Sequence, residues 1–156
     1  MGWQEEIEEK FSLEKLESVD GIPTYYATLN DIFEIGKVLK KHFEILLDIT
    51  AVDYFKKKEK RFEVVYHFLS LKEKVRLRIK VPVAEGEKVP SYTPLWKNAN
   101  WLEREVDDMF GIEFEGHPDL RRILLYPEFE GHPLRKDYPL KKSQPRMKLL
   151  RPERKE

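Results

Sequence analysis

Apolar side chains first recur at helical spacing at the start of the chain. Trp3, Ile7 and Phe11 are four residues apart, with Glu and Lys between them. This spacing predicts a short amphipathic helix. Residues 22–28 follow and are rich in Tyr and Thr, which is typical of a strand.

A second helix is predicted from residue 31 to about residue 43. Asp31 is followed three residues later by Glu34, which is the pattern of a capping box. The positions that follow give this helix one apolar face. They are Ile32, Ile35, Leu39 and Phe43.

The period of the pattern then changes to two, which is typical of strands. Residues 45–51, 62–68 and 75–81 each alternate apolar side chains with others. The segments between these runs are too short for a parallel crossover, so we expect an antiparallel meander. In the third run the basic side chains point away from the apolar face. We therefore expect one face of the sheet to be wet and the other to carry the helices. The basic residues are Arg76, Arg78 and Lys80.

A third helix is predicted between Thr93 and Gly111. Thr93 is a fair N-cap, Pro94 fits the first helical position, and Gly111 supplies a stop. One stripe of this helix is apolar. It consists of Leu95, Ala99, Leu102, Val106 and Met109, flanked by Trp96 and Phe110.

Charged residues of the third helix suggest how it meets the segment after it. Glu103 lies at the margin of the apolar stripe, where a carboxylate needs a cationic or hydrogen-bonding partner. We hypothesise that Glu103 binds Arg121 or Arg122; the alternative is an edge residue whose carboxylate reaches water. Arg104 and Asp108 are four residues apart, and we expect them to pair on the outer face.

The last third of the chain does not fit a globule. Residues 111–156 hold six of the ten prolines, which leaves no room for a sizeable helix or a central strand. The same stretch is too apolar to be disordered. We therefore predict an α+β fold with two parts. Residues 1–110 form a domain with a small, mostly antiparallel sheet and helices on one face. Residues 111–156 form a long extended C-terminal arm that lays its apolar side chains against a partner protein.

Two copies of the sequence Phe-Glu-Gly-His-Pro, residues 114–118 and 129–133, lie in the arm. With nearby Asp119 or Asp137, their histidines His117 and His132 leave a metal enzyme open as an alternative, which metal analysis would test. A histidine between Gly and Pro in a turn more often bonds the backbone. We therefore expect two structural turn anchors and assign no metal ligands.

The amino-acid composition excludes several kinds of catalytic and cofactor site. The 156 residues contain no cysteine, which excludes disulfides, thiol nucleophiles and Cys-held clusters within this chain. The longest stretch without charge covers only residues 21–30, so we expect no direct membrane insertion. No glycine loop for phosphates and no nucleophile elbow is present. We accordingly assign no catalytic and no cofactor-binding residue.

Charge is balanced, with 29 basic and 29 acidic side chains, but unevenly spread. Residues 1–20 are mainly acidic and residues 141–156 mainly basic. The basic tail leaves a nucleic-acid-binding module as a distant alternative. Such binding would weaken steeply with salt. Neutral overall charge and the lack of a reading motif favour no nucleic-acid partner.

Residues 101–140 closely resemble the 30-kilodalton subunit family of the proton-pumping NADH–quinone oxidoreductase, respiratory complex I, whose bacterial members are its C-type subunits. Upstream segments are similar as well, so the resemblance covers about residues 45–140. The family signature maps without gaps onto Glu103-Arg104-Glu105, Asp108, Met109, Phe110, His117 and Arg121.

The resemblance implies a non-catalytic structural subunit of the hydrophilic arm of the complex. It would assemble with the neighbouring D-type subunit around the quinone-reducing module, at the cytoplasmic side of the membrane. NADH, FMN, iron–sulfur clusters and quinone would be bound elsewhere in the parent complex. Related membrane-bound hydrogenases and ferredoxin- or coenzyme-linked dehydrogenases contain similar subunits, so the electron donor stays open. The residues expected to fix the arm and its partner are Glu103, Arg104, Glu105, Asp108, His117, Arg121, Arg122, His132, Arg135 and Asp137.

Overall fold

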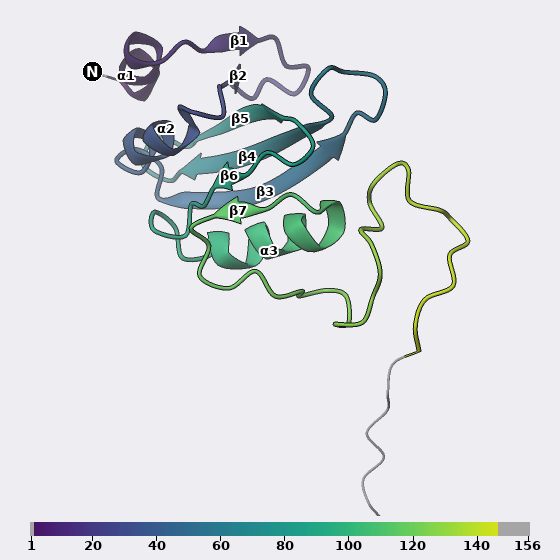
Figure 1. Ribbon diagram of the computed structural model, residues 1–156. Coiled ribbons are helices and arrows are strands. Elements are labelled where there is room, and N and C mark those ends of the chain that lie inside the picture. Colours follow the sequence, from purple (N-terminus) through teal and green to yellow (C-terminus); the bar gives the residue numbers. More distant parts are fainter. Residues whose placement is uncertain (1, 147–156) are drawn as a thin grey trace, which may run out of the picture.

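The computed structural model describes residues 2–146, which form three helices, a five-stranded sheet and a small two-stranded sheet (Figure 1). Residues 147–156, with most of the basic tail, lie outside this range. The helices are α1 (Trp3–Lys10), α2 (Ile32–Leu39) and α3 (Ala99–Phe110). The strands are β1 (Glu14–Leu16), β2 (Thr24–Tyr26), β3 (Ile45–Asp53), β4 (Phe62–Ser70), β5 (Val75–Val83), β6 (Val89–Pro90) and β7 (Phe114–Glu115).

The main sheet has the strand order β1-β2-β5-β4-β3. The predicted antiparallel meander of β3, β4 and β5 is confirmed. The predicted first strand is shorter than expected, and it pairs in parallel with β5, so that Tyr25 lies opposite Ile79. Neither this pairing nor β1 was predicted, because β1 is short and charged and the partner of β2 lies far along the chain. The α+β class with a mostly antiparallel sheet is confirmed.

All three helices and every strand except β1 contribute side chains to a single apolar cluster. In β5, Leu77, Ile79 and Val81 are fully buried, whereas the alternating basic residues point away as predicted. The outer face is not uniformly wet, however. Glu63 on β4 is also buried there, because Tyr26 and Lys58 bind its carboxylate.

Two helix boundaries differ from the prediction. Helix α2 ends at Leu39, and turns over residues 40–42 lead to Phe43, which is still buried. Helix α3 begins only at Ala99, so the predicted start at Thr93 is wrong. Ser91 and Tyr92 instead donate hydrogen bonds to the Glu103 carboxylate, which keeps this segment beside the helix. The predicted stop is confirmed: Gly111 has a φ of 70° and its N–H donates to the carbonyl of Asp107.

Candidate functional site

The chain immediately after α3 returns to the domain. Strand β7 pairs in parallel with β6, with Phe114 opposite Val89. Ile112 and Phe114 are buried in the common core. From residue 116 to residue 146 there is no further helix or strand, and this segment passes under α3 before it extends away from the sheet (Figure 1). The contacts along α3 form a seam that contains most of the predicted site residues.

His117 anchors the first part of the seam. Its Nε2 lies 3.0 Å from the carbonyl oxygen of Asn100, and its Nδ1 accepts the N–H of Asp119 at 3.0 Å. This arrangement fits a neutral ring with the proton on Nε2. One turn further along α3, Arg104 donates from Nε to the carbonyl of Arg121 at 2.8 Å and from Nη2 to that of Arg122 at 3.1 Å. Both side chains therefore hold the backbone of the arm.

Asp108 binds the next turn of the arm from inside. Its Oδ2 accepts three backbone N–H groups, from Ile123, Leu124 and Leu125, at 2.9 to 3.1 Å, and its Oδ1 accepts Arg122 Nη1 at 2.7 Å. Desolvation alone raises the pKa of this fully buried carboxyl. The backbone N–H groups and Arg122 outweigh that effect and hold the pKa below its usual value.

The hypothesis that Glu103 binds Arg121 or Arg122 is wrong, and so is the Arg104–Asp108 pair. Asp108 binds Arg122 instead, while Arg104 binds carbonyl groups. Helical geometry explains the exchange, since residues five apart project about 140° from one another. When Asp108 lies under the arm, Glu103 must point into the core.

Glu103 is fully buried and has no cationic partner in residues 2–146. Its carboxylate accepts Ser91 Oγ at 2.6 Å and the N–H of Tyr92 at 2.5 Å. Desolvation raises the pKa of Glu103 to about 7, against the opposing effect of these two hydrogen bonds. Glu103 thus fastens the turn before α3 to the helix, and it forms no hydrogen bond with the described part of the arm.

The second Phe-Glu-Gly-His-Pro copy caps the end of α3. The carbonyls in the last turn of a helix have no partner within it. Here His132 Nδ1 lies 2.9 Å from the carbonyl oxygen of Asp108, Leu134 N–H donates to Met109 at 3.1 Å, and Arg135 Nε donates to Phe110 at 2.5 Å. The expectation that both histidines bond the backbone is confirmed.

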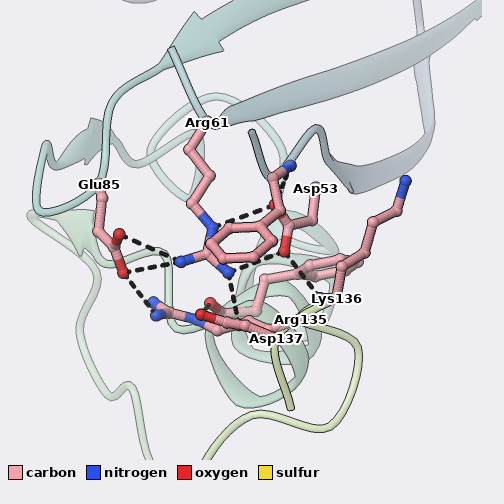
Figure 2. Close-up of polar contacts among 8 residues, drawn as sticks. Asp53, Arg61, Glu85, Arg135, Lys136 and Asp137 are labelled. Atoms are coloured by element: carbon pink, nitrogen blue, oxygen red, sulfur yellow. Dashed lines mark hydrogen bonds and ion pairs between the residues drawn. The ribbon is translucent and has the colours of Figure 1, made fainter. Parts of the chain in front are cut away.

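A second anchor of the arm surrounds Arg61, where the ends of three strands meet (Figure 2). Arg61 donates hydrogen bonds to the Asp53 carboxylate from Nε at 3.1 Å and from Nη2 at 2.9 Å. It also donates from Nη1 to Glu85 at 3.1 Å and from Nη2 to Asp137 at 2.6 Å. Arg135 also binds Glu85, at 2.8 Å. The hydrogen bonds to Asp53 and Asp137 raise the pKa of Arg61, so its charge is permanent.

The sequence reasoning missed Arg61, Asp53 and Glu85, although a signal was present. In an antiparallel meander the end of the first strand, the start of the second and the end of the third lie side by side at the same end of the sheet. The observed register places Asp53 opposite Phe62 and Phe62 opposite Val83. This register brings the side chains of Asp53, Arg61 and Glu85 close together.

The remaining predicted site residues are more exposed. Arg121 pairs with Asp119 at 2.8 Å, and its side chain is 82% exposed. Glu105 is exposed on the outer face of α3. Beside the seam lies a groove of about 660 Å³. It is lined by Arg104, Asp107, Asp108, Leu120, Arg121, Arg122, Pro127 and His132.

Residues 2–146 contain neither a metal-binding cluster nor a membrane span. No three His, Asp or Glu side chains gather there as a set that would hold a metal ion. No helix within that range has the length and apolar character needed to cross a membrane.

Comparison with solved structures defines the class of protein. A chain of the membrane-bound sulfane sulfur reductase, an archaeal respiratory membrane complex, matches with a TM-score of 0.75 and 26% identity, over 88% of this chain and 83% of that one. The fold is thus that of an α+β subunit found in respiratory membrane complexes.

Sequence comparison identifies the family. The family model described as respiratory-chain NADH dehydrogenase, 30 Kd subunit, matches residues 25–144. The C-type subunit of the NADH-quinone oxidoreductase of Trichlorobacter lovleyi is 50% identical over 141 residues, which is 87% of each chain. The second C-type subunit of Rhizobium meliloti is 47% identical over 83% of this chain and 73% of its own length. The chain belongs to this 30-kilodalton subunit family, as the resemblance of its sequence indicated.

Proposed function

We propose that this chain is a structural, non-catalytic subunit of an NADH–quinone oxidoreductase. In this proposal it lies in the hydrophilic arm of the complex, on the cytoplasmic side of the membrane, and assembles with a D-type subunit around the quinone-reducing module. NADH, FMN, iron–sulfur clusters and quinone are bound by other subunits. The observation that carries the proposal is the 50% identity to a C-type subunit over 87% of both chains.

The anchored arm supports a role in assembly. Several of its groups form hydrogen bonds that fasten it to α3 and to Arg61. Its apolar side chains are only partly covered, since Leu124, Leu134 and Leu140 stay exposed at 61, 53 and 98%. Exposed leucines gathered on one segment favour a protein partner.

Co-purification tests the proposal directly. We expect tagged chain to bring down the D-type subunit encoded in the same genome as a stoichiometric complex. Recovery of the tagged chain alone, with both proteins soluble, would contradict it.

A second test uses two neighbouring arginines. Arg121→Lys should weaken binding of the D-type subunit roughly tenfold, because lysine cannot fork onto a carboxylate. Within residues 2–146 the exposed Arg121 side chain pairs with Asp119 alone, so melting of the isolated chain should barely change. Arg122→Lys is the contrast: Arg122 binds Asp108 and the carbonyl of Gly131, so this variant should melt lower. An Arg121→Lys variant that unfolds would overturn the division between domain and arm.

The alternative is the equivalent subunit of a related complex with another electron donor, such as a membrane-bound hydrogenase or a ferredoxin- or coenzyme-linked dehydrogenase. The similarity to a chain of the sulfane sulfur reductase supports this alternative. The support is weaker, because the identity is 26%, against 50% to the C-type subunit. Purification of the native complex would decide between them. Bound FMN and oxidation of NADH support the first proposal, whereas a complex that lacks both supports the alternative.

A further inference from the structure

The outer face of α3 exposes the one tryptophan in the described chain that is not buried. Trp3 and Trp96 are 4 and 3% exposed, whereas Trp101 is 61% exposed. Leu124, on the arm beside α3, is exposed to the same degree. Tryptophan is the residue type most enriched among interface anchors, because it buries a large area at low entropic cost.

Trp101 lies on a rigid support. The guanidinium of Arg104 is 5.4 Å from the centre of the Trp101 ring. Arg104 is itself fixed by its two hydrogen bonds to the carbonyls of Arg121 and Arg122. A surface that is already ordered loses little entropy when a partner binds.

The adjoining groove contains a carboxylate that has no protein partner among the described residues. Asp107 lines the groove and is half-buried, yet its side chain forms no hydrogen bond or ion pair with any residue of the described range 2–146. Desolvation raises its pKa, and Glu113 and Asp108 add to the effect, while His132 and Arg122 oppose it.

The neighbouring cations of the groove are already engaged. Arg122 neutralises Asp108, Arg121 pairs with Asp119, and Arg104 binds carbonyls. Asp107 is therefore the lining charge that an external cation would complement. A partially desolvated carboxylate gains more from such a cation than one in open water.

We propose that Trp101, Leu124 and the Asp107 groove form the docking surface for the D-type subunit, which inserts a lysine or arginine into the groove and covers the indole with apolar side chains. The inference rests on the proposed function and adds the surface and the chemistry of the partner. Asp107 and Trp101 lie outside the set of residues selected from the sequence.

Binding of the purified D-type partner to four forms of this chain tests the proposal. Trp101→Ala should weaken binding at least tenfold, which is about 1.4 kcal/mol. Asp107→Asn should weaken it about fivefold and flatten its salt dependence, because the charge is removed at nearly constant shape. Leu71→Ala is the control, since Leu71 is 58% exposed in the turn between β4 and β5 and should leave binding at the wild-type level.

Hydroxyl-radical footprinting of the wild-type chain gives a reading that needs no variant. Trp101 should be oxidised in the isolated chain and protected in the complex. Wild-type binding with Trp101 unprotected and both variants unaffected would overturn the inference and leave the proposed function intact. Protection of Trp101 in the isolated chain that grows with its concentration would overturn it in favour of a second copy. Failure of the wild-type chain to bind at all would overturn the proposed function itself.

Discussion

Two buried carboxyl groups on helix α3 have pKa values that are shifted in opposite directions. Asp108 is surrounded by N–H donors and a guanidinium, which lower its pKa, whereas Glu103 meets only a hydroxyl and one amide, and its pKa rises. Both are fully buried. The donors around Asp108 outweigh its desolvation, whereas the two hydrogen bonds of Glu103 do not, so the two pKa values shift in opposite directions.

Stability should depend on pH through Glu103. Its pKa is about 7 in the folded chain and near 4.5 when unfolded, so the folded state binds the extra proton between these values. Stability from this group is therefore complete below pH 4.5 and is lost as pH rises through 7, by about 3 kcal/mol. Urea denaturation of wild type and Glu103→Gln at pH 5 to 8 measures this. The wild-type free energy of unfolding should fall relative to the variant; parallel curves would refute the assignment.

At this scale, sequence reasoning correctly predicted the backbone contacts of the two histidines but paired several charged residues of α3 wrongly. The turn setting of His117 and His132 was sufficient to predict backbone contacts. The partner of Glu103 was not predictable, since it depends on which face of α3 the arm covers, and that is fixed by contacts far apart in the sequence.

At the scale of elements, α3 is held at both ends and along the side that faces the arm. Glu103 holds the turn before it, Arg104 and Asp108 hold residues 121–125, and residues 132–135 cap its end. The alternating runs predicted β3, β4 and β5 because each strand has one apolar face. The start of α3 was misplaced because Thr93 and Pro94 satisfy a local rule that the Glu103 hydrogen bonds override.

Arg61 should control whether residues 135–137 stay docked. Arg61→Lys keeps the charge but loses the bidentate hydrogen bond to Asp53. We therefore expect the free energy of unfolding to fall by about 2 kcal/mol. The amide of Lys136, which donates to Asp53 at 2.8 Å, should exchange faster with solvent. Lys60→Arg is a matched control, because Lys60 is a half-exposed neighbour that pairs with Glu87. Equal exchange in both variants would show that Arg61 is not the anchor.

At the scale of the whole molecule, the arm divides into docked and exposed parts. Its proline spacing correctly excluded long helices and central strands from residues 116–146. How much of it the domain would cover was not predictable from composition, because the docked part is held by single carboxylates and arginines. Whether the exposed part embraces a partner, and whether the domain ends at residue 110, stay predictions.

Truncation tests the predicted boundary. A chain of residues 1–110 loses the buried side chains of Ile112 and Phe114, each worth roughly 1.5 to 3 kcal/mol. A chain of residues 1–118 keeps both side chains together with Gly111, and both truncated chains lack the contacts of residues 132–135 with the end of α3. We expect the longer form to be more stable by about 3 kcal/mol or more in urea denaturation. Equal stabilities would place the boundary at residue 110.

The Arg61 cluster also has a consequence for biosynthesis. Domains generally fold from the N-terminus as the ribosome releases them. Asp53, Arg61 and Glu85 emerge well before Asp137, the last acidic group that Arg61 binds. The Asp53, Arg61 and Glu85 side chains can therefore meet while the arm is still being translated, and the ion pair between Arg61 and Asp137 forms only after Asp137 has left the ribosome.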